Sequence, residues 1–116
     1  MEKRRTKLMI DREMTWYYLR ISYFPQFMAG VMRIEWPERF QILKELYDND
    51  PEDIPWEIRS EDPMADMMRW VGSKGESAYF KFFVKGTKVN KDGSFKLHPN
   101  ISKCLGVFGI GTDERL

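Results

Sequence analysis

Aromatic and basic side chains alternate late in the sequence, an arrangement that can bind nucleic acid. The alternating residues are Tyr79, Lys81, Phe83 and Lys85. If they share one face of a strand, their rings can stack on unpaired bases while their ammonium groups neutralise phosphates. Three lysines that follow extend the same basic track: Lys88, Lys91 and Lys96. The pattern predicts contact with single-stranded nucleic acid, without a ribonucleoprotein motif, zinc finger or helix-turn-helix signature to specify it.

The same alternation also has a purely structural interpretation. Tyr79 and Phe83 can pack under helices or against a second copy of the chain. A homodimer is therefore possible. The lysines would then protect an edge strand from aggregation. The exposure of the two rings separates these interpretations.

Carboxylates concentrate in the middle of the chain and offer a second kind of binding surface. Residues 45–76 contain ten acidic and three basic side chains, whereas the flanking segments are both basic. Carboxylates along a surface can occupy the phosphate-binding groove of a basic partner protein. The residues predicted for that contact are Asp48, Asp50, Glu52 and Asp53. The chain would then be a small inhibitor or adaptor, although a solvated acidic loop explains the same residues.

Methionine and tryptophan provide another protein-binding alternative. Met64, Met67 and Met68 share a predicted helix with Trp70. Flexible thioethers suit interfaces that repack against a partner. The same arc also suits the filling of a core beneath a sheet.

No set of residues predicts catalysis, a metal or a cofactor. His98 and Cys104 are the only residues of their kinds, and a Cys–His nucleophile needs spatial adjacency that a sequence does not show. The segment from Lys88 resembles a calcium loop with Gly93 at its sixth position, but a lysine stands where the first carboxylate belongs and Pro99 where the glutamate belongs. We therefore expect a non-enzymatic binding module.

Composition indicates one folded domain in a reducing compartment. The 116 residues carry a net charge of +1 and are 42% hydrophobic, which is enough to bury a core. One cysteine excludes an internal disulfide. The basic start at 1–7 is followed by charged residues at 11–13, so no secretory leader is expected, and the uncharged run at 21–32 is too short to span a membrane. These features favour a cytoplasmic protein, or a nuclear one in a eukaryote, without a membrane partner.

Three strands are expected before the acidic segment, at 6–11, 15–24 and 27–35. The second is rich in β-branched and aromatic residues and puts alternate apolar side chains on one face. Pro25 separates it from the third strand, and the two are expected to form a hairpin.

Two helices and a second hairpin are expected after these strands. One helix is expected to begin at Trp36-Pro37. The other is expected to be capped by Asp62-Pro63 and to end at Gly72. Alternation predicts a strand at 78–85, a turn at 90–93 and a returning strand at 94–98, with a last strand near 107–110.

The expected fold class is therefore α+β, with an antiparallel sheet of about five strands and two helices packed on one face. Residues 1–116 form a single domain in this interpretation. A flexible basic arm at 1–6 and a frayed tail at 112–116 flank it.

Overall fold

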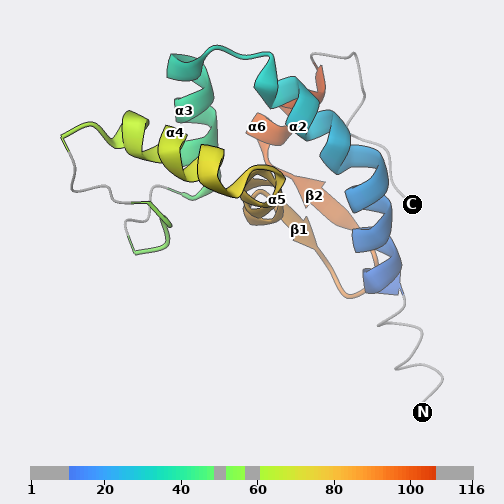
Figure 1. Cartoon of the computed structure of the whole chain (residues 1–116). Coiled ribbons are helices and arrows are strands. Elements are labelled where there is room, and N and C mark those ends of the chain that lie inside the picture. Colours follow the sequence, from blue (N-terminus) through green and yellow to red (C-terminus); the bar gives the residue numbers. More distant parts are fainter. Residues whose placement is uncertain (1–10, 49–51, 57–60, 107–116) are drawn as a thin grey trace.

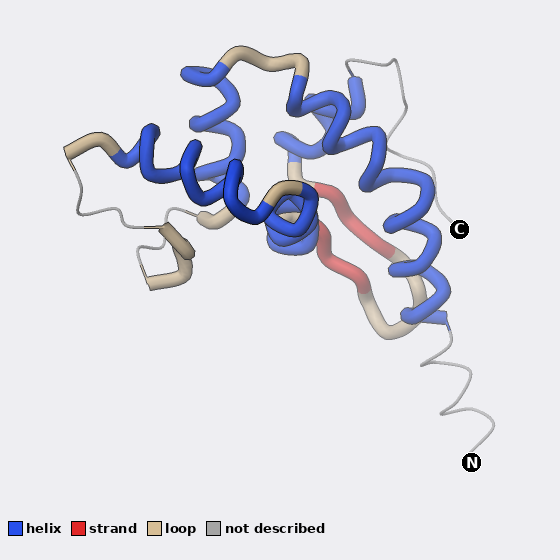
Figure 2. The backbone as a smooth tube through the Cα atoms, viewed as in Figure 1, coloured by secondary structure: helices blue, strands red, loops and turns tan. Residues whose placement is uncertain are grey.

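The chain folds mostly into helices, with one small two-stranded antiparallel sheet in the part that the structure describes (Figures 1 and 2). The computed structural model describes residues 11–48, 52–56 and 61–106. The expected α+β fold with a five-stranded sheet is wrong. Nearly all the residues that were expected to supply three of its strands, at 15–24, 27–35 and 78–85, are helical instead.

A single long helix replaces the predicted hairpin of strands 15–24 and 27–35. Residues 11–18 are α-helical, η1 (Leu19–Tyr23) is a π-helical segment, and α2 (Phe24–Met32) continues on the same path (Figure 1). We call residues 11–32 the first helix. Pro25 lies in the first turn of α2, where it has no N–H to donate. The preceding π turn, closed by the Phe24 N–H donating to the Leu19 carbonyl, accommodates the proline within a continuous helix.

The π turn also keeps the buried side of the first helix in phase. Five buried side chains recur every fourth position: Thr15, Leu19, Tyr23, Phe27 and Val31. In a regular α-helix with 3.6 residues per turn, a spacing of four would carry these positions steadily around the axis. A wider turn in the middle reverses this drift. Leu19, Tyr23, Phe27 and Val31 therefore all reach the hydrophobic core, and Thr15 is buried against the hairpin turn.

Two helices appear where proline and capping residues predict them. α3 (Trp36–Leu46) begins with Pro37 in its first turn, and α4 (Pro63–Lys74) begins after Asp62, whose Oδ1 accepts the Ala65 N–H at 3.1 Å. α4 passes the expected end at Gly72 and stops at Gly75, which has a φ of 59°. This left-handed conformation favours glycine and turns the chain directly into the next helix.

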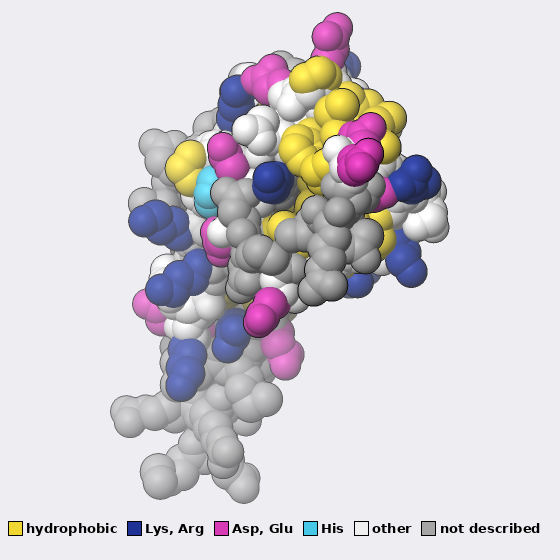
Figure 3. Space-filling model, turned by 90° about the vertical axis from the view of Figure 1, so that its left-hand side faces the viewer, with side chains coloured by type: hydrophobic (Ala, Val, Ile, Leu, Met, Phe, Trp, Pro, Cys, Tyr) yellow, Lys and Arg dark blue, Asp and Glu magenta, His cyan; other side chains and the backbone are white. Residues whose placement is uncertain are grey.

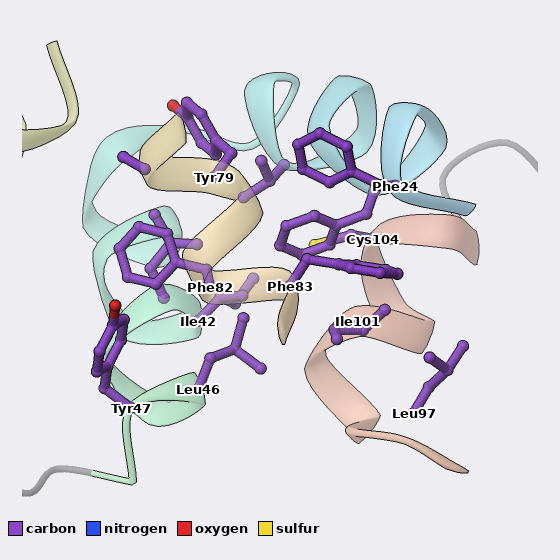
Figure 4. Packing of buried hydrophobic residues seen from close by; sticks show 14 of the residues in the cluster. Phe24, Ile42, Leu46, Tyr47, Tyr79, Phe82, Phe83, Leu97, Ile101 and Cys104 are labelled. Carbon is purple, nitrogen blue, oxygen red and sulfur yellow. The ribbon is translucent and has the colours of Figure 1, made fainter. Parts of the chain in front are cut away.

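That next helix, α5 (Glu76–Lys85), lies at the centre of the fold, where a strand was expected. Its four core residues form two pairs four positions apart, namely Ala78, Tyr79, Phe82 and Phe83. Figure 4 shows the two phenylalanines pointing to opposite sides. Phe82 meets Tyr47 at 5.2 Å between ring centroids, and Phe83 meets Phe24 at 5.6 Å. Burial on both sides of α5 holds the segment as a helix despite its β-favouring residues.

The prediction for the second hairpin is partly wrong. Its returning strand and turn are present, but its first strand is a different segment, because the expected strand at 78–85 is helical. β1 (Thr87–Val89) pairs antiparallel with β2 (Phe95–Leu97). In the turn between them Gly93 has a φ of 91°, the left-handed conformation that a glycine at this position predicted. In both strands the central residue is exposed and its neighbours are buried. The hairpin therefore covers the helices with one face and turns the other to solvent.

A further helix, α6 (Pro99–Gly106), follows the hairpin and was not expected from the sequence. It packs closely on α2, since a Cβ added to Gly30 would lie 2.2 Å from the Cys104 carbonyl oxygen. The absence of a side chain at Gly30 therefore allows the two backbones to approach. The predicted strands at 6–11 and 107–110 lie outside the described residues, apart from Asp11, which is helical, and so do the predicted arm and tail.

Candidate functional site

The two rings predicted to stack on bases are buried in the core. Tyr79 is 6% exposed and Phe83 is 0% exposed. The Phe83 ring lies 5.6 Å from the ring of Phe27 and 5.6 Å from that of Phe24, measured between centroids. The exposed aromatic strand face does not form, so the feature that favoured base stacking is lost.

The lysines of the same prediction separate into two groups. Lys81 and Lys85 lie on α5, where the Lys81 ammonium is 5.8 Å from the centroid of the Trp70 ring. Lys85 forms an ion pair with Asp53. Lys88 and Lys96 lie on the solvent-facing side of the hairpin, and Lys91 is exposed in its turn. Without the rings, what remains is a set of cations.

The acidic segment does not gather into a metal site. Asp48, Glu52 and Asp53 are exposed, whereas Asp50 lies outside the described residues. Asp53 is already paired with Lys85. No group of three potential ligands suited to a metal ion occurs within residues 11–48, 52–56 and 61–106.

His98 and Cys104 have separate structural environments. The His98 Nδ1 accepts the Asn100 N–H at 3.0 Å, at the start of α6. Cys104 is 0% exposed, and burial raises the pKa of its thiol to about 11. A thiol that keeps its proton at neutral pH is a poor nucleophile. The arrangement supports a structural role for Cys104.

The methionine and tryptophan arc of α4 is divided between core and surface. Met67 is fully buried, and the half-buried Trp70 ring lies 5.6 Å from Phe82 and 5.8 Å from Trp56 between centroids. Met68, in contrast, is 40% exposed. Figure 3 looks at the side where α3 and α4 lie and shows hydrophobic side chains gathered in its upper part, with charged side chains around them. Much of this arc therefore fills the core, but it packs against Phe82 of α5 and against Trp56, and not beneath the expected sheet.

The most exposed apolar residues lie elsewhere, on the first helix. Tyr17 is 63% exposed, Ile21 56% and Met32 53%, and each is large and apolar. With Pro25 and Met28 they recur at spacings of four, four, three and four, which places them along one side of a helix. The helical spacing of these residues is visible in the sequence between positions 14 and 32. It was missed because this segment was expected to form two strands.

Two adjoining hollows lie beside this exposed side. One, of about 560 Å³, lies along the first helix, and the other, of about 540 Å³, lies between the first helix and α5. Both are lined by Tyr17 and Arg20. We call the two hollows together the apolar groove, which is lined by Trp16, Tyr17, Arg20, Ile21, Phe24, Pro25, Met28, Glu76, Phe80 and Val84.

One cation lies in the middle of the apolar groove. The Arg20 guanidinium is 4.9 Å from the centroid of the Phe80 ring, a cation–π contact. Within the described part of the chain Arg20 forms no ion pair. The groove therefore combines an apolar lining with a positive charge that is available to a ligand.

Comparisons with protein-family models, with curated proteins and with solved structures find no match to this chain. None of the described helices has the length and hydropathy needed to cross a membrane. The functional argument therefore depends on the geometry of the chain itself.

Proposed function

We propose that this chain is a protein-binding module that holds an amphipathic helix of a partner protein in the apolar groove. The observation that carries the proposal is the exposure of large apolar side chains along one side of the first helix, led by Tyr17 and Ile21. Exposed apolar residues that adjoin one another are typical of interaction sites, whereas scattered ones are ordinary.

The composition of the groove suits a protein ligand. Tyrosine, tryptophan, methionine and arginine are enriched in protein interfaces, and Tyr17, Trp16, Met28 and Arg20 supply one of each here. The groove follows a helix for several turns, so a partner helix can place apolar anchors three, four and seven residues apart along it. Because Ile21 is 56% exposed, burying the rest of it against such a helix would contribute about 1–1.5 kcal/mol.

Arg20 defines the charge of the proposed partner. Its guanidinium stands between the two hollows and is neutralised by no carboxylate in the described residues, while Glu76 lies at one side of the groove. A desolvated cation needs an opposite charge to offset the loss of water. The partner helix should therefore carry a carboxylate between its apolar anchors.

The test is a selection of displayed helical peptides on the purified wild-type protein. We expect enriched peptides to share apolar residues at helical spacing and a central Asp or Glu. Ile21→Glu should weaken their binding at least tenfold, because it places a charge within the apolar contact. It should leave the fold intact, since Ile21 is more than half exposed.

Two controls make the result specific. Met68→Glu changes an exposed apolar residue outside the groove and should leave binding unchanged. Arg20→Glu should reverse the preference, so that peptides with a central Lys bind instead. Equal losses in Ile21→Glu and Met68→Glu, or wild-type dimerisation abolished by Ile21→Glu, would contradict the proposal. The latter result would assign the groove to a second copy of the chain.

A further inference from the structure

Two lysines face each other directly on the solvent-facing side of the hairpin. Lys88 and Lys96 are partners in the strand register. The Asn90 N–H donates to the Ser94 carbonyl at 2.8 Å, and the His98 N–H donates to the Gly86 carbonyl at 2.7 Å. The lysines lie midway between these two bonded pairs, in the position where antiparallel partners stand about 5.5 Å apart at Cα. Like charges directly opposite on one face destabilise a hairpin.

A hollow adjoins this lysine pair. It has a volume of about 330 Å³ and lies where β1 and β2 meet the end of α5 and the start of α6. Its lining includes Lys85, Lys88, Lys96 and His98. Because the His98 Nδ1 accepts the Asn100 N–H, the proton of the neutral ring is on Nε2, which is left as a donor. The hollow thus lies beside the two facing lysines and a ring N–H, while the ammonium of Lys85 is paired with Asp53.

The lysine pair has no counter-charge in the described part of the molecule. The ion pairs there engage Lys85 with Asp53, Lys103 with Glu38 and Arg69 with Asp66, and neither Lys88 nor Lys96 takes part.

The hairpin's own carboxylate, Asp92, is already committed to the turn. Its Oδ1 accepts the Ser94 N–H at 3.0 Å and the Ser94 hydroxyl at 2.7 Å. These hydrogen bonds lower the pKa of Asp92. Asp92 therefore stays ionised but is held at the turn, and no ion pair joins it to Lys88 or Lys96 in the described residues. The repulsion between the two lysines can thus be relieved by a ligand.

We infer that this hollow is a phosphate-binding site, independent of the apolar groove, and that its ligand is the backbone of single-stranded nucleic acid. Phosphate oxygens accept hydrogen bonds from several ammonium groups at once and would offset the repulsion between Lys88 and Lys96. Lys91, exposed in the turn of the same hairpin, extends the cations beyond the hollow. That extension favours a chain of phosphates over one isolated phosphate. Since the predicted stacking rings are buried, binding should be independent of base sequence.

The test measures binding of a fluorescent single-stranded oligonucleotide at several salt concentrations, and of inorganic pyrophosphate by calorimetry. The double variant Lys88→Gln, Lys96→Gln should weaken oligonucleotide binding at least tenfold. It should also reduce the slope of log K against log salt by about 1.4, since each phosphate neutralised on a single strand contributes about 0.7. Amide shifts of Lys88 and Lys96 on addition of oligonucleotide would locate the contact.

The control variant is Lys74→Gln, at the end of α4, which removes one exposed cation outside the hollow. It should retain wild-type binding. The double variant should melt at or above the wild-type temperature. A loss of oligonucleotide binding in that variant is then a loss of ligand contacts and not of the fold. If the wild-type protein binds pyrophosphate but no oligonucleotide, and the double variant loses the pyrophosphate, the phosphate site stands and the nucleic-acid ligand is overturned. If the wild-type protein binds neither ligand, or if Lys74→Gln loses as much oligonucleotide binding as the double variant, the inference is overturned.

Discussion

At the scale of single residues, Gly30 and Cys104 determine how closely two helices meet. Gly30 lies on α2 and Cys104 on α6, and the space for a Cβ at Gly30 is occupied by the Cys104 carbonyl. A backbone carbonyl cannot rotate away as a side chain would. The contact is therefore sensitive to the smallest substitution.

Gly30→Ala should destabilise the protein by about 3 kcal/mol, because its Cβ forces α2 and α6 apart. The measurement is urea unfolding followed by circular dichroism. Gly72→Ala is the matched control, since a Cβ there has nothing within 4 Å and alanine favours a helix interior by up to about 1 kcal/mol. Equal stability of the two variants would show that the close approach is absent in solution.

The buried thiol of Cys104 predicts a loss of stability at alkaline pH. Its pKa in the folded chain is about 11, above its ordinary value of 9.0. Below pH 9 the thiol is protonated in both states and stability is unaffected by it. Between pH 9 and 11 only the unfolded chain releases the proton, so the free energy of unfolding should fall by about 1.4 kcal/mol per pH unit.

Cys104→Ala should make this alkaline decline shallower, whatever its effect on stability at pH 7. Burial also raises the pKa of Tyr47, so part of the decline above pH 10 should remain. The readout is the slope of unfolding free energy against pH. The same slope in wild type and variant would assign the decline to other groups.

At the scale of elements, the first helix shows how one pattern can fit two structures. Thr15, Leu19 and Tyr23 are buried, and Tyr17 and Ile21 between them are exposed. A strand would put all five on one face, because alternate residues share a face. A helix divides them, since positions four apart share a side and positions two apart do not. Aromatic and β-branched residues favoured the strand, but packing against the other helices decided for the helix.

The hairpin yields a prediction at the same scale. Lys96→Thr should stabilise the ligand-free protein by about 0.5 kcal/mol, because it removes the repulsion with Lys88 and adds a residue that favours strands. Thermal unfolding at low salt is the measurement. Lys91→Thr, in the turn without a strand partner, should show little change. A loss of stability in Lys96→Thr would mean that the lysine pair is already neutralised.

At the scale of the whole molecule, contacts distant in sequence hold the elements together. The Thr15 hydroxyl can donate to the Asp11 carbonyl at 2.9 Å and to the Gly93 carbonyl at 2.8 Å. The second bond joins residues 78 positions apart and attaches the turn of the hairpin to the first helix. This contact fixes the position of the hairpin, and with it the Lys88–Lys96 face, relative to the helices.

Thr15→Val should cost about 1 kcal/mol, because valine keeps the shape but leaves the Gly93 carbonyl without this donor. The amides of Asn90 and His98 should exchange with deuterium faster, since both close hairpin hydrogen bonds. Ser73→Ala is the control, as that hydroxyl donates only within α4, to Trp70. Unchanged exchange in Thr15→Val would show that the hairpin is held by its apolar face alone.

Local chemistry in the sequence determined the parts that depend on neighbouring residues. Three features follow from positions within a few residues of one another: the proline at the start of α3, the Asp62 cap of α4 and the glycine turn of the hairpin. Tertiary structure decided whether 15–24 and 78–85 would be strand or helix, because both segments carry apolar residues that satisfy either period. It also decided which of those residues face solvent. The apolar groove exists because the first helix and α5, which are far apart in sequence, meet there, and local patterns carry no information about that meeting. The lysine face, in contrast, is formed within one hairpin.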